Sequence, residues 1–225
     1  MKATDLLEAA LGFSEYSKGA TYSASDICGE PLQIKLKKKY PNQDDVKPLD
    51  KVASWVGTGA HLQLERFIAA ENEFGATNME SEVKLKFRNL SGTADVILDG
   101  NIICDLKTSK EATLKTTIKK PEKWIKQLSV YNYLNHKQRG HDMAEFGYIF
   151  WIAVDTRKIG TTKIKLMTLK ETVVMIKEFM VEMEIPIEDE TKCKSCSWLW
   201  KWCPVRKKCD FYQEDDMTGI DDWTN

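Results

Sequence analysis

Apolar residues change their spacing along the chain, from a helical period near residue 60 to alternation after residue 80. Between residues 52 and 68 they recur at steps of three and four, which predicts a helix with one apolar face. Residues 82–87, EVKLKF, instead alternate apolar and charged side chains, as a half-buried strand does. The apolar stripe of the helix consists of Val52, Trp55, Val56, Ala60, Leu64, Phe67 and Ile68.

Two more strands follow the first and predict an antiparallel meander. Residues 92–100, GTADVILDG, and 101–108, NIICDLKT, are joined at Asp99-Gly100-Asn101, a strong signal for a tight turn. The second of these strands carries apolar side chains on both faces, at Ile102 and Ile103, which is typical of a central strand.

The rest of the chain alternates helices with apolar runs and predicts an α/β fold, a sheet with helices against its faces. Residues 23–26 offer a cap for a helix running to about residue 40, and 41–50 form a polar loop. Trp124, Leu128, Tyr131 and Leu134 mark one face of an amphipathic helix over 119–136. The further predictions are helices over 4–11 and 171–183, a buried strand over 146–155 and its edge partner over 161–169.

The composition is that of a folded protein with balanced charge. The 225 residues include 33 Lys and Arg against 34 Asp and Glu, a net charge of −1, so binding nucleic acid by overall charge is excluded. No apolar run reaches the roughly 18 residues needed to cross a membrane. The acidic, weakly apolar N-terminus does not resemble a secretion signal. We therefore expect a cytoplasmic protein with no membrane partner.

Two acids and a lysine on the meander are the strongest candidates for chemistry. Asp105 and Lys107 are two residues apart on one strand, so their side chains share a face, and the hairpin brings Asp95 beside them. Carboxylates converging on an apolar sheet are unfavourable unless a cation neutralises them, and oxygen ligands suit Mg²⁺ or Mn²⁺. Such an ion polarises a phosphodiester and activates water, while the lysine orients or deprotonates that water. The alternative is a solvated Asp–Lys pair.

These residues resemble the signature of the PD-(D/E)XK nuclease superfamily. Asp95 followed by Asp105-Leu106-Lys107 fits that signature, although Ala94 stands where it has proline. The segments Gly57–Glu65, with His61, and Gln127–Tyr131 resemble two further motifs of its RecB-type exonuclease branch. Cysteines near the C-terminus are similar to those of phage and CRISPR-associated members with a four-cysteine iron–sulfur cluster.

The resemblance implies a restriction-endonuclease-like core and a DNA exonuclease dependent on Mg²⁺ or Mn²⁺, in phage or bacterial recombination, repair or DNA processing. It implies that His61, Asp95, Asp105 and the carbonyl of Leu106 bind the metal. It assigns Lys107 to catalysis and Gln127 and Tyr131 to shaping the site and contacting DNA. The host would be a bacterial or phage-infected cell.

Each of these residues also has a plain structural interpretation. His61, on a helix with an apolar stripe, can be a core or surface histidine with no metal to bind. Tyr131, four residues from Gln127 on the same helix face, can be a residue of the hydrophobic core. Glu80 and Glu82 are interpreted as solvent-facing charges of the first strand, with a second-metal carboxylate as the alternative. The competing functions are a structure-specific endonuclease on the same core and a non-catalytic, metal-stabilised module for nucleic-acid binding or assembly.

Four cysteines near the C-terminus predict a second metal site. Cys193, Cys196, Cys203 and Cys209 follow the pattern C-x2-C-x6-C-x5-C, and such thiolates hold zinc or an iron–sulfur cluster. The family resemblance favours a 4Fe-4S cluster, with structural Zn²⁺ as the alternative. Cys28 is the alternative ligand, joining three of the four, whereas Cys104 is assigned to the core.

The sequence therefore predicts three regions: a nuclease domain over 1–190, a cysteine-rich annex over 191–212 and an acidic tail over 213–225. The tail is expected to be disordered or to dock a protein partner. Lysine and arginine clusters near residues 35–39, 115–126 and 206–208 suit a path for the DNA backbone, single- or double-stranded. No oligomeric state is predicted.

Overall fold

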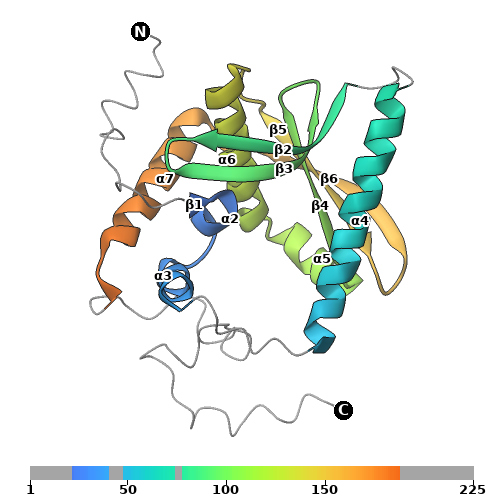
Figure 1. The fold of residues 1–225 in the computed structure, drawn as a ribbon, viewed down its shortest axis with the longest axis horizontal. Coiled ribbons are helices and arrows are strands. Elements are labelled where there is room, and N and C mark those ends of the chain that lie inside the picture. Colours follow the sequence, from blue (N-terminus) through green and yellow to red (C-terminus); the bar gives the residue numbers. More distant parts are fainter. Residues whose placement is uncertain (1–21, 41–47, 74–77, 188–225) are drawn as a thin grey trace, which may run out of the picture. The chain divides into compact units, whose positions relative to one another are not determined.

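A computed structural model of the protein describes residues 22–40, 48–73 and 78–187. Its helices are α2 (Ala24–Ile27), α3 (Pro31–Lys39), α4 (Pro48–Glu73), α5 (Glu111–Lys119), α6 (Glu122–Arg139) and α7 (Leu169–Glu184). Its strands are β1 (Tyr22–Ser23), β2 (Met79–Phe87), β3 (Leu90–Leu98), β4 (Ile102–Ser109), β5 (Phe146–Ala153) and β6 (Lys158–Lys165). Figure 1 shows the elements in place.

The strands form one mixed sheet of six, which confirms the predicted α/β class. The order is β1-β3-β4-β5-β6, and β2 pairs with β3. The antiparallel pairs β2–β3 and β3–β4 are the predicted meander, with β4 central between β3 and β5. The strands β4 and β5 are parallel, which requires a long connection, and α5 and α6 provide it. The last strand, β6, lies at an edge of the sheet, as predicted.

The chain divides into two compact units. One comprises Met1–Cys28 and Val46–Met180, and the other comprises Gly29–Asp45 and Val181–Asn225. The first unit holds the whole sheet with α2, α4, α5, α6 and the part of α7 up to Met180. In the second unit, the ammonium group of Lys35 is buried and donates hydrogen bonds to the carbonyls of Glu182 and Ile185, each at 2.6 Å. Lys35 therefore caps the C-terminus of α7 and is not part of a solvated basic cluster.

One helix prediction and one loop prediction need correction near the N-terminus. Ser23 does cap a helix, through a reciprocal pair of hydrogen bonds with Asp26, but α2 ends at Ile27 and a new helix begins at Pro31. Proline disfavours helical backbone in the residue before it, and Glu30 is accordingly extended, with φ −85° and ψ 122°. The loop predicted over 41–50 is also too long, because α4 already begins at Pro48.

The long helix α4 is confirmed, but its apolar stripe is narrower than predicted. Ile68 is buried in a cluster with Val96 and Cys104 of the sheet. Val56 and Phe67, by contrast, are 45% and 55% exposed. Cys104 is fully buried, as predicted.

Residues 128–135 of helix α6 are buried on all sides, whereas an amphipathic helix was predicted. The four predicted apolar residues are buried, and so are the polar residues Ser129, Asn132 and Asn135. The amide groups of Asn132 and Asn135 donate to the carbonyls of Ala144 and Gly100, each at 2.9 Å, so burial leaves these donors satisfied. The neighbouring helix α5 was not predicted at all.

Among the described residues, no helix has the length and apolarity needed to span a membrane. The predicted helix over 4–11, the cysteine annex and the acidic tail lie outside the described residues.

Candidate active site

The centre of the site is a fork between β3 and β4. The two strands pair from Val96 with Cys104 to Leu98 with Ile102, and Asp95 and Asp105 are the next residues, where the strands part. The amide N–H of Leu106 donates a hydrogen bond of 2.7 Å to Oδ2 of Asp95. This bond holds the Asp95 carboxylate against the β4 backbone, so the predicted convergence of both acids is confirmed.

Lys107 connects the acids to helix α6. Its Nζ lies 2.7 Å from Oδ2 of Asp105, whose side chain is only 3% exposed, against 29% for that of Lys107. Lys107 also donates to Oε1 of Gln127 at 3.4 Å, and Nε2 of Gln127 donates to the hydroxyl of Tyr131 at 3.2 Å. Gln127 and Tyr131 share a face of α6, one helical turn apart, which places both beside Lys107. The structure therefore brings these predicted residues into one network.

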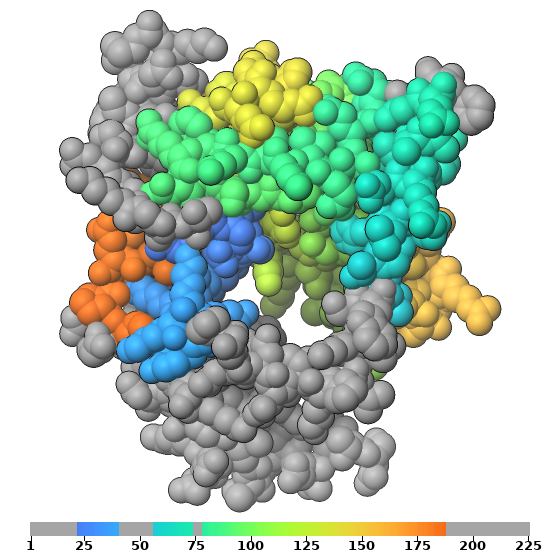
Figure 2. All heavy atoms as spheres, in the orientation of Figure 1, coloured from blue at the N-terminus to red at the C-terminus, as the bar shows by residue number. Residues whose placement is uncertain are grey.

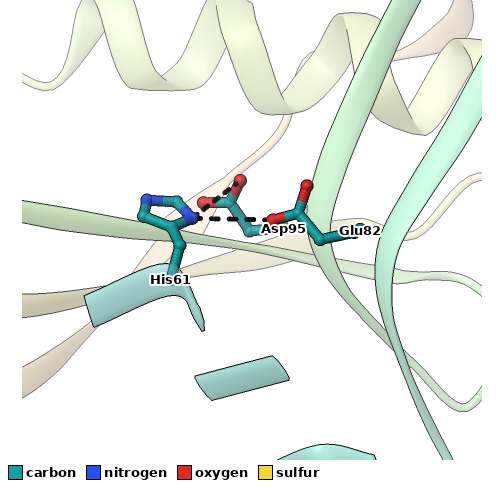
Figure 3. A group of neighbouring side chains, drawn as sticks. All are labelled: His61, Glu82 and Asp95. Carbon is teal, nitrogen blue, oxygen red and sulfur yellow. Dashed lines mark ion pairs between the residues drawn. The ribbon is translucent and has the colours of Figure 1, made fainter. Parts of the chain in front are cut away.

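His61 approaches the fork from α4, and Figure 3 shows its ring facing two carboxylates. Its Nδ1 lies 3.6 Å from Oδ1 of Asp95 and 3.7 Å from Oε1 of Glu82. Both distances exceed those of ordinary hydrogen bonds. One ligand atom from each of the three residues lies within 4.8 Å of the others, a grouping that could hold a metal ion. One imidazole nitrogen and two carboxylates are donors that divalent cations accept in proteins.

A cleft of about 520 Å³ opens beside this group, between α4 and the hairpin of β2 and β3. Figure 2 shows α4, in teal, beside that hairpin, in green. Helix α4 lies close to the sheet here: a Cβ added to Gly57 would stand 3.2 Å from Oγ1 of Thr108 on β4. The lining residues are Gly57, Thr58, His61, Leu62, Glu65, Glu82 and Asp95.

Burial raises the proton affinity of both acids. It raises the pKa of Asp95 to about 6, with the charge of Asp105 as the second cause. Burial also raises the pKa of Asp105, although Lys107 opposes the shift. The pKa of the Tyr131 hydroxyl rises to about 12, again mainly through burial. The positive charges of Lys107 and His61 therefore do not fully compensate the two buried carboxylates, and a further positive charge would stabilise their ionised form.

Cys28 lies close to the same network but is a protonated thiol here. Its Sγ donates to the carbonyl of Ala24 at 3.2 Å, and burial raises its pKa to about 12 against the opposing charges of Lys126, Lys123 and Lys107. The predicted ligands Cys193, Cys196, Cys203 and Cys209 lie outside the described residues, so the cysteine site stays a prediction.

The residue that sequence reasoning underrated is Glu82. Alternation along β2 predicted a solvent-facing charge, and its side chain is indeed 43% exposed, but it faces His61 at the cleft. Glu80, by contrast, pairs with Arg139 at 2.6 Å. No local signal in the sequence separates these two acids. The backbone of Glu82 departs from strand geometry, with a φ of +50°.

The chain belongs to the PD-(D/E)XK nuclease superfamily, whose family model matches residues 18–209. The fold and the fork with its acids and lysine are those of this class, and membership supports a nuclease function with a nucleic-acid substrate. Nucleases of this superfamily use divalent metal ions, and the group around His61 is a candidate site for one.

Solved structures with the same fold include that of a protein called SSO0001. It is 19% identical, has a TM-score of 0.59, and the match covers 95% of this chain and 98% of that one. The alkaline exonuclease of Laribacter hongkongensis is 14% identical with a TM-score of 0.47, covering 82% and 94% of the two chains. A phage-related exonuclease from Haemophilus somnus 129PT is 12% identical with a TM-score of 0.48, covering 77% and 95%. No curated protein matches the chain.

Proposed function

We propose that the protein is a divalent-metal-dependent DNA exonuclease. The observation that carries the proposal is the convergence of Asp95, Asp105 and Lys107 at the fork of β3 and β4. A buried carboxylate pair with raised pKa values beside an open cleft is unfavourable for stability alone and is typical of a catalytic site.

A divalent cation would be held by His61, Asp95, Asp105 and the carbonyl of Leu106, the ligands that the motif resemblance implies. Of these, His61 and Asp95 belong to the group whose ligand atoms lie within 4.8 Å of one another. Such an ion polarises the phosphodiester and lowers the pKa of a bound water. Asp95 is oriented for this role by the N–H of Leu106, and Asp105 by the ammonium group of Lys107.

Lys107 positions the attacking water and stabilises negative charge as the water oxygen bonds to phosphorus and the P–O bond to the leaving strand breaks. Gln127 accepts from Lys107 and donates to Tyr131, so the pair limits where the ammonium group can point. This positioning matters because small displacements of a catalytic group greatly slow a reaction.

The cleft is compatible with action at a strand end, which the motif resemblance implies. Its volume of about 520 Å³ is in the range of pockets that hold a small ligand, the size of a nucleotide. A strand terminus can enter such a cleft beside the fork. The sequence motifs that resemble the RecB-type branch support DNA as the substrate.

The test is cleavage of linear DNA, single- and double-stranded, with Mn²⁺ or Mg²⁺. We expect Asp105→Asn and Lys107→Ala to lower the rate about 100-fold or more, as loss of transition-state stabilisation does. Glu178→Gln, which removes a charge from an exposed position on α7, serves as the control. Equal rates in all four proteins would overturn the proposal.

Closed circular DNA separates an exonuclease from an endonuclease. An exonuclease leaves the circle intact and releases nucleotides from the linear form, whereas nicking of the circle would replace the exonuclease assignment with endonuclease on the same core. A protein that cleaves neither DNA and shows no Mn²⁺ binding that depends on Asp95 and Asp105 would support a non-catalytic module instead.

We also propose a 4Fe-4S cluster on Cys193, Cys196, Cys203 and Cys209, on the strength of their spacing and the motif resemblance. Protein purified without oxygen should be brown and contain iron. A colourless protein with one zinc per chain would favour the zinc alternative.

A further inference from the structure

We propose that Glu82 is a further ligand of the divalent cation, sharing it with His61 and Asp95. The inference rests on the proposed function, since it concerns the same metal site. It adds a residue from β2 to the ligands His61, Asp95, Asp105 and Leu106 that the motif resemblance implies.

The first argument is the spacing of the donor atoms. Ligands about 2.1 Å from one octahedral cation stand about 3 Å apart when adjacent and about 4.2 Å apart when opposite. The separations at His61 are 3.6 Å to Asp95 and 3.7 Å to Glu82, and all three donors lie within 4.8 Å of one another. Small side-chain rotations would therefore bring the three atoms around a common ion. Figure 3 shows the ring of His61 facing both carboxylates.

The second argument is the backbone of Glu82. Its φ of +50° lies in the left-handed region, which is unfavourable for a residue with a Cβ. Its neighbours Ser81 and Val83 pair regularly with Val96 and Ala94, so the distortion is confined to the position opposite Asp95. A local distortion at an unfavourable φ, in an otherwise regular ladder, is typical of functional positions.

The third argument is the contrast between Glu82 and Glu80 on the same strand. Glu80 is neutralised by Arg139 at 2.6 Å. In the described part of the chain, the ion-pair partner of Glu82 is His61, at 3.7 Å. Glu82 therefore adds negative charge beside Asp95, and a bound cation would compensate both.

The test is Mn²⁺ binding to the metal-free full-length protein, measured by isothermal titration calorimetry. We expect Glu82→Gln to raise the dissociation constant about tenfold or more, because it removes a charged ligand and keeps the side-chain size. The control Glu178→Gln, with the same change of charge away from the cleft, should leave the constant within about twofold of the wild type.

A second variant separates ligand loss from misfolding. Glycine tolerates positive φ, so Glu82→Gly should raise the melting temperature of the metal-free protein while weakening Mn²⁺ binding. Opposite changes in stability and binding would support the proposal. Wild-type affinity in both Glu82 variants would overturn it, and a wild-type protein that binds no Mn²⁺ would instead overturn the metal dependence proposed for the nuclease.

Discussion

At the scale of single residues, the site depends on a buried carboxylate and its neighbouring ammonium group. Asp105 is almost fully buried, and Lys107, only partly exposed, lies 2.7 Å from it. A charge buried without a partner is strongly destabilising, whereas a pair partly compensates its own desolvation. Lys107, which we propose acts in catalysis, therefore also supports the fold.

Replacing Lys107 should destabilise the metal-free protein. Because Lys107→Met leaves Asp105 unpaired, we expect the free energy of unfolding to fall by about 1–3 kcal/mol. Adding Asp105→Asn should recover most of that loss. Urea denaturation in the presence of a chelator measures both, and strictly additive effects of the two substitutions would contradict the pairing.

Asp95 should make metal-free stability depend on pH. Its folded pKa is about 6, against an ordinary value of 3.8, so between these values the native state keeps a proton that the unfolded chain releases. The free energy of unfolding therefore falls as pH rises from about 4 to 6. Above that window the loss caused by Asp95 stays constant and no longer changes with pH.

We expect Asp95→Asn to remove this dependence. At pH 7 it should stabilise the metal-free protein by about 1–3 kcal/mol, from a shift of about two pKa units at about 1.4 kcal/mol each. The measurement is urea denaturation at about pH 5 and pH 7 for both proteins. Parallel pH profiles would contradict the raised pKa of Asp95.

At the scale of elements, the position of a residue was predicted correctly where it follows from local strand and turn geometry, and less well where it depends on how distant elements pack. Asp105 and Lys107 share a face because they are two apart on one strand, which follows from local geometry. Asp95 was placed correctly because a short turn fixes the register of β3 and β4. His61 could be placed only through the motif resemblance, and Glu82 was underrated, since both contacts depend on how α4 and β2 pack.

The helices show the same dependence of prediction on local signals and on distant packing. Gly29 and Pro31 are local signals for the break between α2 and α3, but the cap at residues 23–26 was taken as the start of one helix ending near residue 40. The burial of residues 128–135 of α6 on all sides could not be predicted from the sequence. Polar residues such as Asn132 and Asn135 are expected to face solvent, and their carbonyl partners lie outside the helix.

The contact between β3 and α6 gives a prediction at this scale. A Cβ on Gly92 would stand 2.6 Å from the ring of Tyr131 and 3.2 Å from Ala24. We expect Gly92→Ala to displace Tyr131 from Gln127, lowering both the nuclease rate and the free energy of unfolding, the latter by about 1–3 kcal/mol. Nuclease assays and urea denaturation measure the two effects.

The matched control is Gly59→Ala in α4. Nothing lies within 4 Å of its added Cβ, and alanine favours a helix, so the free energy of unfolding should rise by about 0.5–1 kcal/mol. If Gly92→Ala also stabilised the protein and kept full activity, close packing of Tyr131 on β3 would not matter for the site.

At the scale of the whole molecule, the chemistry is concentrated in one of the two units. His61, Glu82, Asp95, Asp105 and Lys107 all belong to the unit formed by Met1–Cys28 and Val46–Met180. The four late cysteines belong by sequence to the other unit, Gly29–Asp45 and Val181–Asn225. Hydrophobic patterning predicted the sheet and its helices, but it carries no information on this division, in which α3 is grouped with the C-terminal segment.

The division into two units predicts that loss of the metal bound by the cysteines leaves Mn²⁺ binding at the nuclease site unchanged. The change is Cys196→Ser with Cys203→Ser in the full chain, which removes two thiolate ligands. We expect iron or zinc to be lost and the melting temperature to fall, because metal binding stabilises the fold that holds it. The affinity for Mn²⁺ should stay within about twofold of the wild type, because every proposed Mn²⁺ ligand lies in the first unit. Metal analysis, thermal melting and calorimetry on one preparation measure all three, and a large loss of Mn²⁺ affinity in a folded double variant would show that the cysteine segment supports the catalytic site directly.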